Sequence, residues 1–309
     1  DKVKGYWVDG CYEWIGYNDN LFKIFAEGLR AGNPDRIIAF NPGVDPEIRA
    51  YSLYEDYTCG EQISFSLLPP TGRFVNGEQW HILSFLGTPW NRLPDNGWGK
   101  PGVCKDTQEL AEYIYQVNAL GGVVSIDVLL YRDGELDRSQ LAILKPLREK
   151  INVLLKDRYA WKEGKAVPEK NIAWKKPARL RSNDNKQELI PSVGLVHAAR
   201  NGNDGNRNTT AVGANDWAWT YETDLLEPIK IQRVVVHFGS GYPTDVEIFA
   251  VTPTGNEISL GRFNEQKGQS LDVSFEPKEA RLIRVRSYKP DGPNQSGGQM
   301  SIAELEVYE

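Results

Sequence analysis

The stretch VVSIDVLLY, residues 123–131, decides the fold of the first half of the chain. It is a nearly continuous apolar run after Gly121-Gly122, and such runs are typical of parallel strands that are covered on both faces. A helix pattern that starts at Asp106 or Thr107 precedes it, and another that starts at Asp137 follows it. We therefore expect strands and helices to alternate in this part of the chain.

The alternation extends back to residue 1. Strand patterns lie near residues 5, 38, 56, 83 and 126, and their alternation with helix patterns predicts βαβ units and a parallel sheet. A (β/α)8 barrel needs eight strands, with ~250 residues being typical. We therefore expect residues 1–158 to be an α/β segment, the C-terminal part of such a barrel, completed by a missing N-terminal barrel segment.

The pattern changes after a charged stretch, residues 159–170, which we interpret as a linker. Within 171–309, apolar residues recur with a period of two, between turns rich in Gly, Asn and Pro. The clearest runs centre on Ile248, on Ile283 and on Leu305. This pattern predicts an all-β antiparallel sandwich as a second domain.

Composition excludes several classes of function. There are 36 Lys and Arg against 42 Asp and Glu, a net charge of −6, which argues against a nucleic-acid partner. No apolar run approaches the ~20 residues of a membrane span. Three scattered histidines make a His-ligated metal site improbable. Three cysteines form no disulfide framework, although one bridge, between Cys11 and Cys59, stays open.

Polar side chains follow the expected strands. Asp9 and Asn41 end the first two, Glu55 and Glu61 flank the third, and Trp90 follows the fourth. In barrels, reacting groups lie at the carboxyl ends of strands. Two carboxylates among aromatic residues, without a nucleophile–His pair, indicate acid/base chemistry on sugars. A retaining glycosidase holds its two carboxyl groups about 5–5.5 Å apart, and an inverting one holds them farther apart.

Several motifs resemble glycoside hydrolase family 29, the α-L-fucosidases. Tyr6-Trp7-Val8-Asp9-Gly10 resembles the strand that carries the family's nucleophile, and the run from Asp56 to Gln62 resembles the stretch that carries its acid/base. The segments 80–92 and 121–136 resemble later parts of the same barrel. The resemblance implies that Asp9 is the nucleophile and Glu61 the acid/base, with Glu55 as the alternative.

The same resemblance implies a set of substrate-binding residues: Trp7, Asn41, Glu55, His81 and Trp90. Four of them keep alternative interpretations. His81 is also expected as a hydrogen-bonded structural histidine, Asn41 as a turn residue, and Trp7 and Trp90 as core or loop packing. The segment Asn41-Pro42-Gly43 departs from the family, which has an Arg there in many members. The sugar is therefore fucose or a close relative, such as α-L-galactose.

Residues 171–309 resemble carbohydrate-binding modules of family 32, which are discoidin-like jelly rolls. The segments 171–178, 204–209 and 301–307 carry the resemblance. In relatives they frame a cation site, and Ca²⁺ takes six to eight hard oxygen ligands. The resemblance implies a structural Ca²⁺ held by Asn201, Asp204, Asn206, Thr209, Ala303 and Glu304. No cofactor is expected for catalysis.

The sequence thus predicts a retaining exo-glycosidase acting on terminal α-L-fucosyl residues, with a fucosylated glycan as its partner. The family resemblance places it in the periplasm or outside the cell. Two alternatives come from other classes of protein. One is a non-catalytic glycan-binding protein with a degenerate barrel, and the other is a cell-adhesion role carried by the discoidin-like domain alone.

Overall fold

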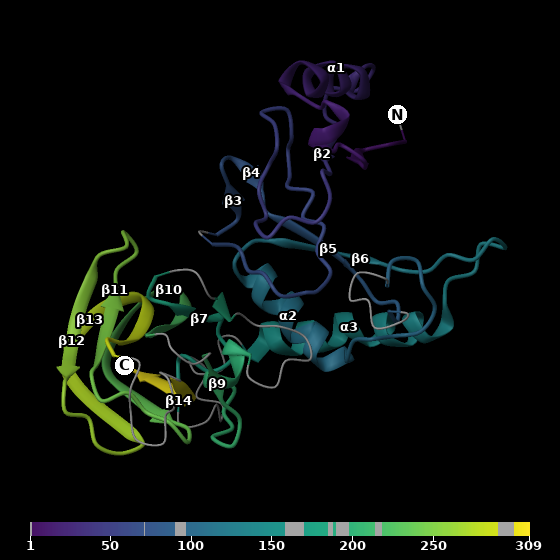
Figure 1. Ribbon diagram of the computed structural model, residues 1–309. Coiled ribbons are helices and arrows are strands. Elements are labelled where there is room, and N and C mark those ends of the chain that lie inside the picture. The colour runs from purple at the N-terminus through teal and green to yellow at the C-terminus, as the bar shows by residue number, and fades with distance from the viewer. Residues whose placement is uncertain are drawn as a thin grey trace. The chain divides into compact units, whose positions relative to one another are not determined.

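A computed structural model gives the fold (Figure 1) and describes residues 2–70, 72–89, 97–157, 170–184, 188–189, 198–213, 218–289 and 300–309. The chain divides into two compact units, Asp1–Ile151 and Asn152–Glu309. All but one residue of the expected linker, 159–170, lies outside the described residues. Among the described helices, none has the length and apolar composition needed to cross a bilayer.

The first unit contains two pairs of parallel strands. β1 (Gly5–Val8) pairs with β2 (Ile37–Phe40), and β5 (His81–Phe85) pairs with β6 (Val123–Asp127). A short antiparallel hairpin of β3 (Phe74–Val75) and β4 (Glu78–Gln79) precedes β5.

The backbone of residues 56–62 runs between the two parallel pairs. On one side the Asp56 amide donates to the Ile38 carbonyl at 2.8 Å. On the other side the Leu83 amide donates to the Gly60 carbonyl at 2.8 Å, and Glu61 forms a parallel bridge with Leu83. Four parallel strands therefore lie at positions that the sequence predicts, whereas the predicted strand near residue 56 is present only as isolated bridges at Tyr57 and Glu61.

A barrel is not evident in the described residues, whose parallel strands form two separate pairs and no closed sheet. β6 is also shorter than the predicted run 123–131, and it is half-buried rather than covered on both faces, with Val123 exposed. β6 is only half-buried because, in the described chain, it pairs with β5 alone.

The three helices begin where their capping residues predict. α1 (Asp19–Arg30) begins after Asn18, and α2 (Thr107–Ala119) after Asp106; in both, the capping side chain accepts two backbone N–H groups. α3 (Arg138–Asp157) runs through Pro146, which was expected to kink or interrupt it. A proline removes a single backbone donor, and a helix of 20 residues continues without it.

The second unit is built from antiparallel strands (green to yellow in Figure 1). They are β7 (Ala178–Ser182), β8 (Glu188–Leu189), β9 (Ala211–Val212), β10 (Trp219–Phe238), β11 (Val246–Val251), β12 (Glu257–Phe263), β13 (Ser270–Ser287) and β14 (Ser301–Tyr308). A 3-10 helix, Ala199–Gly202, precedes β9.

Two long strands connect the layers of this unit. β10 and β13 pair along most of their length, with a register shift between Asp224 and Ile229. Before the shift β10 pairs with β7, and after it β10 pairs with β14. Each long strand therefore belongs to one layer in its first half and to the other in its second, which gives the antiparallel sandwich that the sequence predicts.

The core of the sandwich contains the predicted inward residues, among them Ile248, Ile283 and Leu305. β14 departs from strict alternation, because its first five residues are all buried. This strand lies between β10 and β9, and the Gly205 amide covers the Glu304 carboxylate from the other side.

All three cysteines are free thiols. Cys11 and Cys59 are buried in the first unit, and Cys104 is exposed. The disulfide between Cys11 and Cys59 that the sequence left open is therefore not formed.

Candidate functional site

Three polar side chains meet where the first parallel segments end. The Asn41 Nδ2 donates to Asp9 Oδ1 at 2.9 Å and to Glu61 Oε2 at 2.7 Å. Two oxygens bonded to one nitrogen at these distances lie at most about 5.6 Å apart, which agrees with the spacing of a retaining glycosidase and not with the wider spacing of an inverting one. We call Asp9 and Glu61 the carboxylate pair.

Asn41 serves as the support of the carboxylate pair. Its side chain is 1% exposed, and its Oδ1 accepts the Gly43 amide at 3.1 Å. Its backbone continues the β1–β2 ladder, because the Asn41 amide donates to the Val8 carbonyl at 2.7 Å. The side chain is thus engaged by the protein itself, and it has almost no surface to offer a sugar.

Trp7 connects the two strands that carry the pair. Its indole Nε1 donates to the Cys59 carbonyl at 3.1 Å. Trp7 lies two residues before Asp9, and Cys59 lies two residues before Glu61, so this bond fixes the relative positions of the two carboxylates. The Gly10 amide also donates to Asp9 Oδ1, at 2.7 Å.

Gly60 allows the chain to approach β5 closely enough to place Glu61. It has a φ of +60°, and a Cβ at this position would lie 2.0 Å from the His81 carbonyl oxygen. Only glycine fits such an approach, because any side chain would overlap the backbone of β5.

Glu55 has other hydrogen-bond partners than the carboxylate pair. Its Oε1 accepts the Phe40 amide at 3.0 Å, and its Oε2 accepts the amides of Tyr51 and Ser52 at 2.6 and 2.7 Å. Burial raises the pKa of this carboxyl, against the opposing effect of these three donors. Glu55 therefore orders the loop after β2.

His81 has the surroundings of a hydrogen-bonded structural histidine, which was the alternative interpretation of this residue. Its Nδ1 lies 2.9 Å from the Thr58 carbonyl and its Nε2 lies 2.8 Å from Ser125 Oγ. Burial lowers the pKa of the imidazole. Both ring nitrogens are thus engaged inside the protein, and the ring ties the 56–62 segment to β6.

Two further positions remain to be located. Trp90 lies outside the described residues. Asp127, at the carboxyl end of β6, accepts the Gly99 amide through Oδ2 at 2.8 Å. The sequence interpretation missed it because it treated 123–131 as one apolar strand, although a charged residue within such a run is a signal of a strand end.

Oxygen-bearing residues of the expected cation set gather in the sandwich. Asp204 accepts the Asn206 amide and the Thr209 hydroxyl, at 2.8 and 2.7 Å. Glu304, on β14, accepts the Gly205 amide at 3.0 Å. Asn201 lies in the preceding 3-10 helix, and its Nδ2 donates to the Thr210 carbonyl at 3.4 Å, while Ala303 adjoins Glu304 on β14.

The Glu304 carboxyl is the least solvated member of this set. It is 2% exposed, and its pKa is raised to about 8, first by burial and then by the negative charge of Asp204. A cation beside both carboxylates would offset this cost, and the oxygens present are hard ligands. No three His, Cys, Asp or Glu side chains converge on a metal position within the described ranges, so such an ion would need backbone and amide oxygens.

Comparisons with known proteins gave likenesses to solved structures only. No protein-family model matches the chain, and no curated protein does. Chitosan-binding module 1 of a chitosanase/glucanase from Paenibacillus sp. IK-5 is 20% identical, covering 45% of this chain and 98% of that one, with a TM-score of 0.38.

Two other solved structures are similarly distant. The family 32 module of C. perfringens NanJ, solved with galactose, is 22% identical over 43% of this chain and 92% of its own, with a TM-score of 0.35. A fucose-binding module of Streptococcus pneumoniae is 23% identical over 45% and 94%, also with a TM-score of 0.35. Likeness at this level places the chain in no family.

Proposed function

We propose that this protein is a retaining glycosidase that removes terminal α-L-fucosyl or closely related residues from glycans. The observation that carries the proposal is the position of Asp9 and Glu61, whose oxygens share the Asn41 Nδ2 at 2.9 and 2.7 Å. The resemblance of the Asp9 strand to family 29 supports fucose as the sugar.

The pair can perform double displacement. In the first step an Asp9 oxygen attacks the anomeric carbon, while Glu61 gives its proton to the departing glycosidic oxygen. In the second step Glu61 accepts a proton from water, the water oxygen attacks the same carbon, and the bond to Asp9 breaks. Asn41 holds the two groups at the required spacing throughout.

The sandwich has a separate role in the proposal, which is to bind glycans and keep the enzyme near its substrate. The resemblance of residues 171–309 to family 32 modules supports this role. It also supports action in the periplasm or outside the cell, where such glycans are accessible.

We also propose a structural Ca²⁺ in the sandwich, held by oxygens of Asp204, Asn206, Thr209 and Glu304 together with the Asn201 and Ala303 carbonyls. The buried Glu304 carboxyl, whose pKa is raised to about 8, supports it. The ion would supply shape and charge balance, and no step of hydrolysis depends on it.

Hydrolysis of an aryl α-L-fucoside tests the catalytic proposal, with an α-L-galactoside and a β-D-galactoside as comparison substrates. We expect turnover of the α-L-fucoside, and we expect Asp9→Asn to lower kcat by at least about a thousandfold because the nucleophile is lost. Asp35→Asn, an exposed change in the same unit, is the matched control. Full activity of Asp9→Asn would contradict the assignment of the nucleophile.

A second function rests on the sandwich alone, which has its own apolar core and resembles family 32 modules. Such a protein could bind glycans through the sandwich without hydrolysing them. Folded protein that binds glycans and turns over none of the three glycosides would establish this second function instead.

A further inference from the structure

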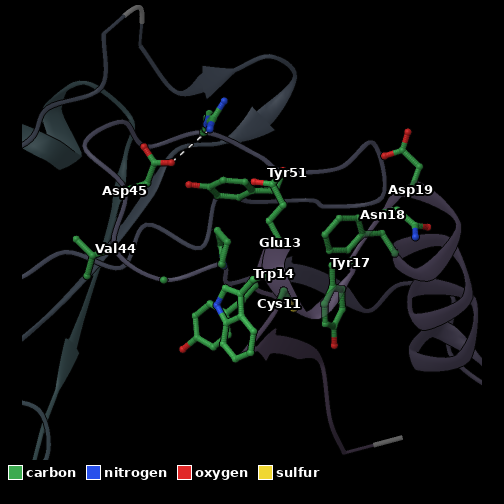
Figure 2. Close-up of a pocket in the computed structure, with 14 residues that line it drawn as sticks. Cys11, Glu13, Trp14, Tyr17, Asn18, Asp19, Val44, Asp45 and Tyr51 are labelled. Carbon is green, nitrogen blue, oxygen red and sulfur yellow. Dashed lines mark hydrogen bonds and ion pairs between the residues drawn. The ribbon is translucent and has the colours of Figure 1, made fainter.

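A cavity of about 490 Å³ lies in the first unit, lined mainly by residues 11–22 and 42–51. In Figure 2, Tyr51 lies above Trp14, with Val44 and Asp45 on the left and Asn18 and Asp19 on the right. We call it the aromatic pocket. Its volume is within the range of small-molecule sites, and neither the catalytic proposal nor the sandwich uses it.

The aromatic pocket has an indole held open to solvent. Trp14 is 82% exposed, in the 3-10 helix Glu13–Ile15 between β1 and α1. The Tyr12 ring stacks against it at 5.5 Å with an angle of 9° between the planes. Two stacked aromatic rings that line a cavity offer a flat apolar face to a ligand.

The pocket also offers polar groups of a suitable kind. Arg49 is fixed between the Asp45 carboxylate, at 3.3 Å, and the Tyr51 ring, at 5.1 Å from its centroid. Among the described lining residues, Glu13, Asp19 and Asp45 carry negative charge and Arg49 alone is cationic. This excess of carboxylates disfavours sulfated, phosphorylated or sialylated ligands, and it provides acceptors for the hydroxyl groups of a neutral sugar.

The position of the pocket relates it to Glu61. Four of its lining residues, Gly43, Asp45, Arg49 and Tyr51, also pack beside Gly60, Glu61 and Gln62, where no space for a water molecule remains. Residues 11 and 12 follow Asp9 closely, and residues 42 and 43 follow Asn41. In a retaining mechanism the acid protonates the departing oxygen, so the leaving group lies on the side of Glu61.

We propose that the aromatic pocket binds the leaving-group part of the substrate, an uncharged oligosaccharide whose ring stacks on Trp14. This rests on the proposed function, because only a glycosidase has a leaving group. The protein would then distinguish fucosylated oligosaccharides from fucosides with small leaving groups, since only the former reach Trp14.

The test compares kcat/KM for an aryl α-L-fucoside with kcat/KM for neutral fucosylated oligosaccharides of α-1,2, α-1,3 and α-1,4 linkage. We expect Trp14→Ala to lower the ratio of oligosaccharide to aryl fucoside about tenfold, the loss of one stacking contact. Trp14→Phe should restore part of it. Ile15→Ala removes an exposed apolar side chain from the same short helix without lining the pocket, and it should leave the ratio unchanged.

Other outcomes separate the two proposals. A ratio that Trp14→Ala leaves unchanged, while the wild-type protein hydrolyses both substrates, overturns the pocket assignment and keeps the catalytic one. No hydrolysis of any substrate by folded protein overturns the catalytic proposal, and the leaving-group assignment fails with it.

Discussion

At the scale of single residues, the site depends on Asn41. An amide nitrogen carries two hydrogens, and here each one is donated to a different carboxylate, Asp9 at 2.9 Å and Glu61 at 2.7 Å. A buried donor between two carboxyl groups offsets the repulsion that they would feel if both were ionised. Because Asn41 is also fixed through its backbone, it holds the two groups in one arrangement.

Removing this support should affect catalysis more than stability. We expect Asn41→Ala to lower kcat on an aryl α-L-fucoside by about 10- to 100-fold, since small displacements of reacting groups cost about that much. Thermal unfolding of the variant shows whether the fold is kept. Asn33→Ala, which removes an exposed turn contact to the Asp35 amide, is the matched control. Unchanged kcat in the Asn41 variant would contradict the positioning role.

At the scale of elements, the segment 56–62 is the critical connection of the first unit. It is too irregular to count as a strand, yet its backbone bonds to β2 on one side and to β5 on the other. Gly60 makes this double pairing fit, and Glu61 follows directly. The position of Glu61 therefore depends on this backbone contact together with the side chains of Trp7 and Asn41.

Gly60→Ala tests this dependence. The new Cβ would lie 2.0 Å from the His81 carbonyl oxygen at a φ of +60°. We expect a loss of more than about 3 kcal/mol in the free energy of unfolding, from overlap and backbone strain together. Gly134→Ala, at a φ of +88° with open space around it, isolates the strain and should cost only about 1 kcal/mol. Denaturant unfolding measures both, and equal losses would rule out the overlap.

At the scale of the whole molecule, the chain combines two units built on different rules. The first places its reactive groups where parallel segments end, and the second surrounds one apolar core with strands that change layers. Each unit contains its own polar centre, the carboxylate pair in one and the Asp204–Glu304 region in the other. A change at the carboxylate pair should therefore leave the response to Ca²⁺ intact. A change in the Asp204–Glu304 region should leave the activity on an aryl α-L-fucoside intact.

Calcium provides the test at this scale. We expect Ca²⁺ to raise the midpoint of thermal unfolding above that of the protein in chelator. The stabilisation reaches about 2.7 kcal/mol when the free Ca²⁺ concentration is a hundred times the dissociation constant. Glu304→Gln should abolish the increase, because the charge is lost while an acceptor oxygen remains for the Gly205 amide. Glu276→Gln, exposed on β13, should keep it.

Calorimetry with and without Ca²⁺ gives the midpoints, and an aryl α-L-fucoside assay of the same samples gives the activity. An unchanged midpoint in the wild-type protein would exclude the ion. An activity that changes with Ca²⁺ would contradict the independence of the two centres.

The sequence by itself determined the local features. Periodicity and capping residues located the strands near residues 5, 38, 83 and 126 and the starts of α2 and α3, because these signals act over a few neighbouring residues. The order of Asp9, Asn41 and Glu61 along the strand ends was readable for the same reason. The layered sandwich also followed, since alternation of apolar residues reports which face of a strand is buried.

Only the tertiary structure decided what each polar side chain does. Glu55 and Glu61 are both acids near the third segment, yet Glu55 is engaged by three backbone amides and Glu61 reaches Asn41. His81 and Asn41 became supports rather than sugar contacts in the same way. The hydrogen-bond partners that decide the roles of His81 and Asn41 lie 20 or more residues away along the chain. A pattern among neighbouring residues carries no information about contacts that form only when distant segments meet.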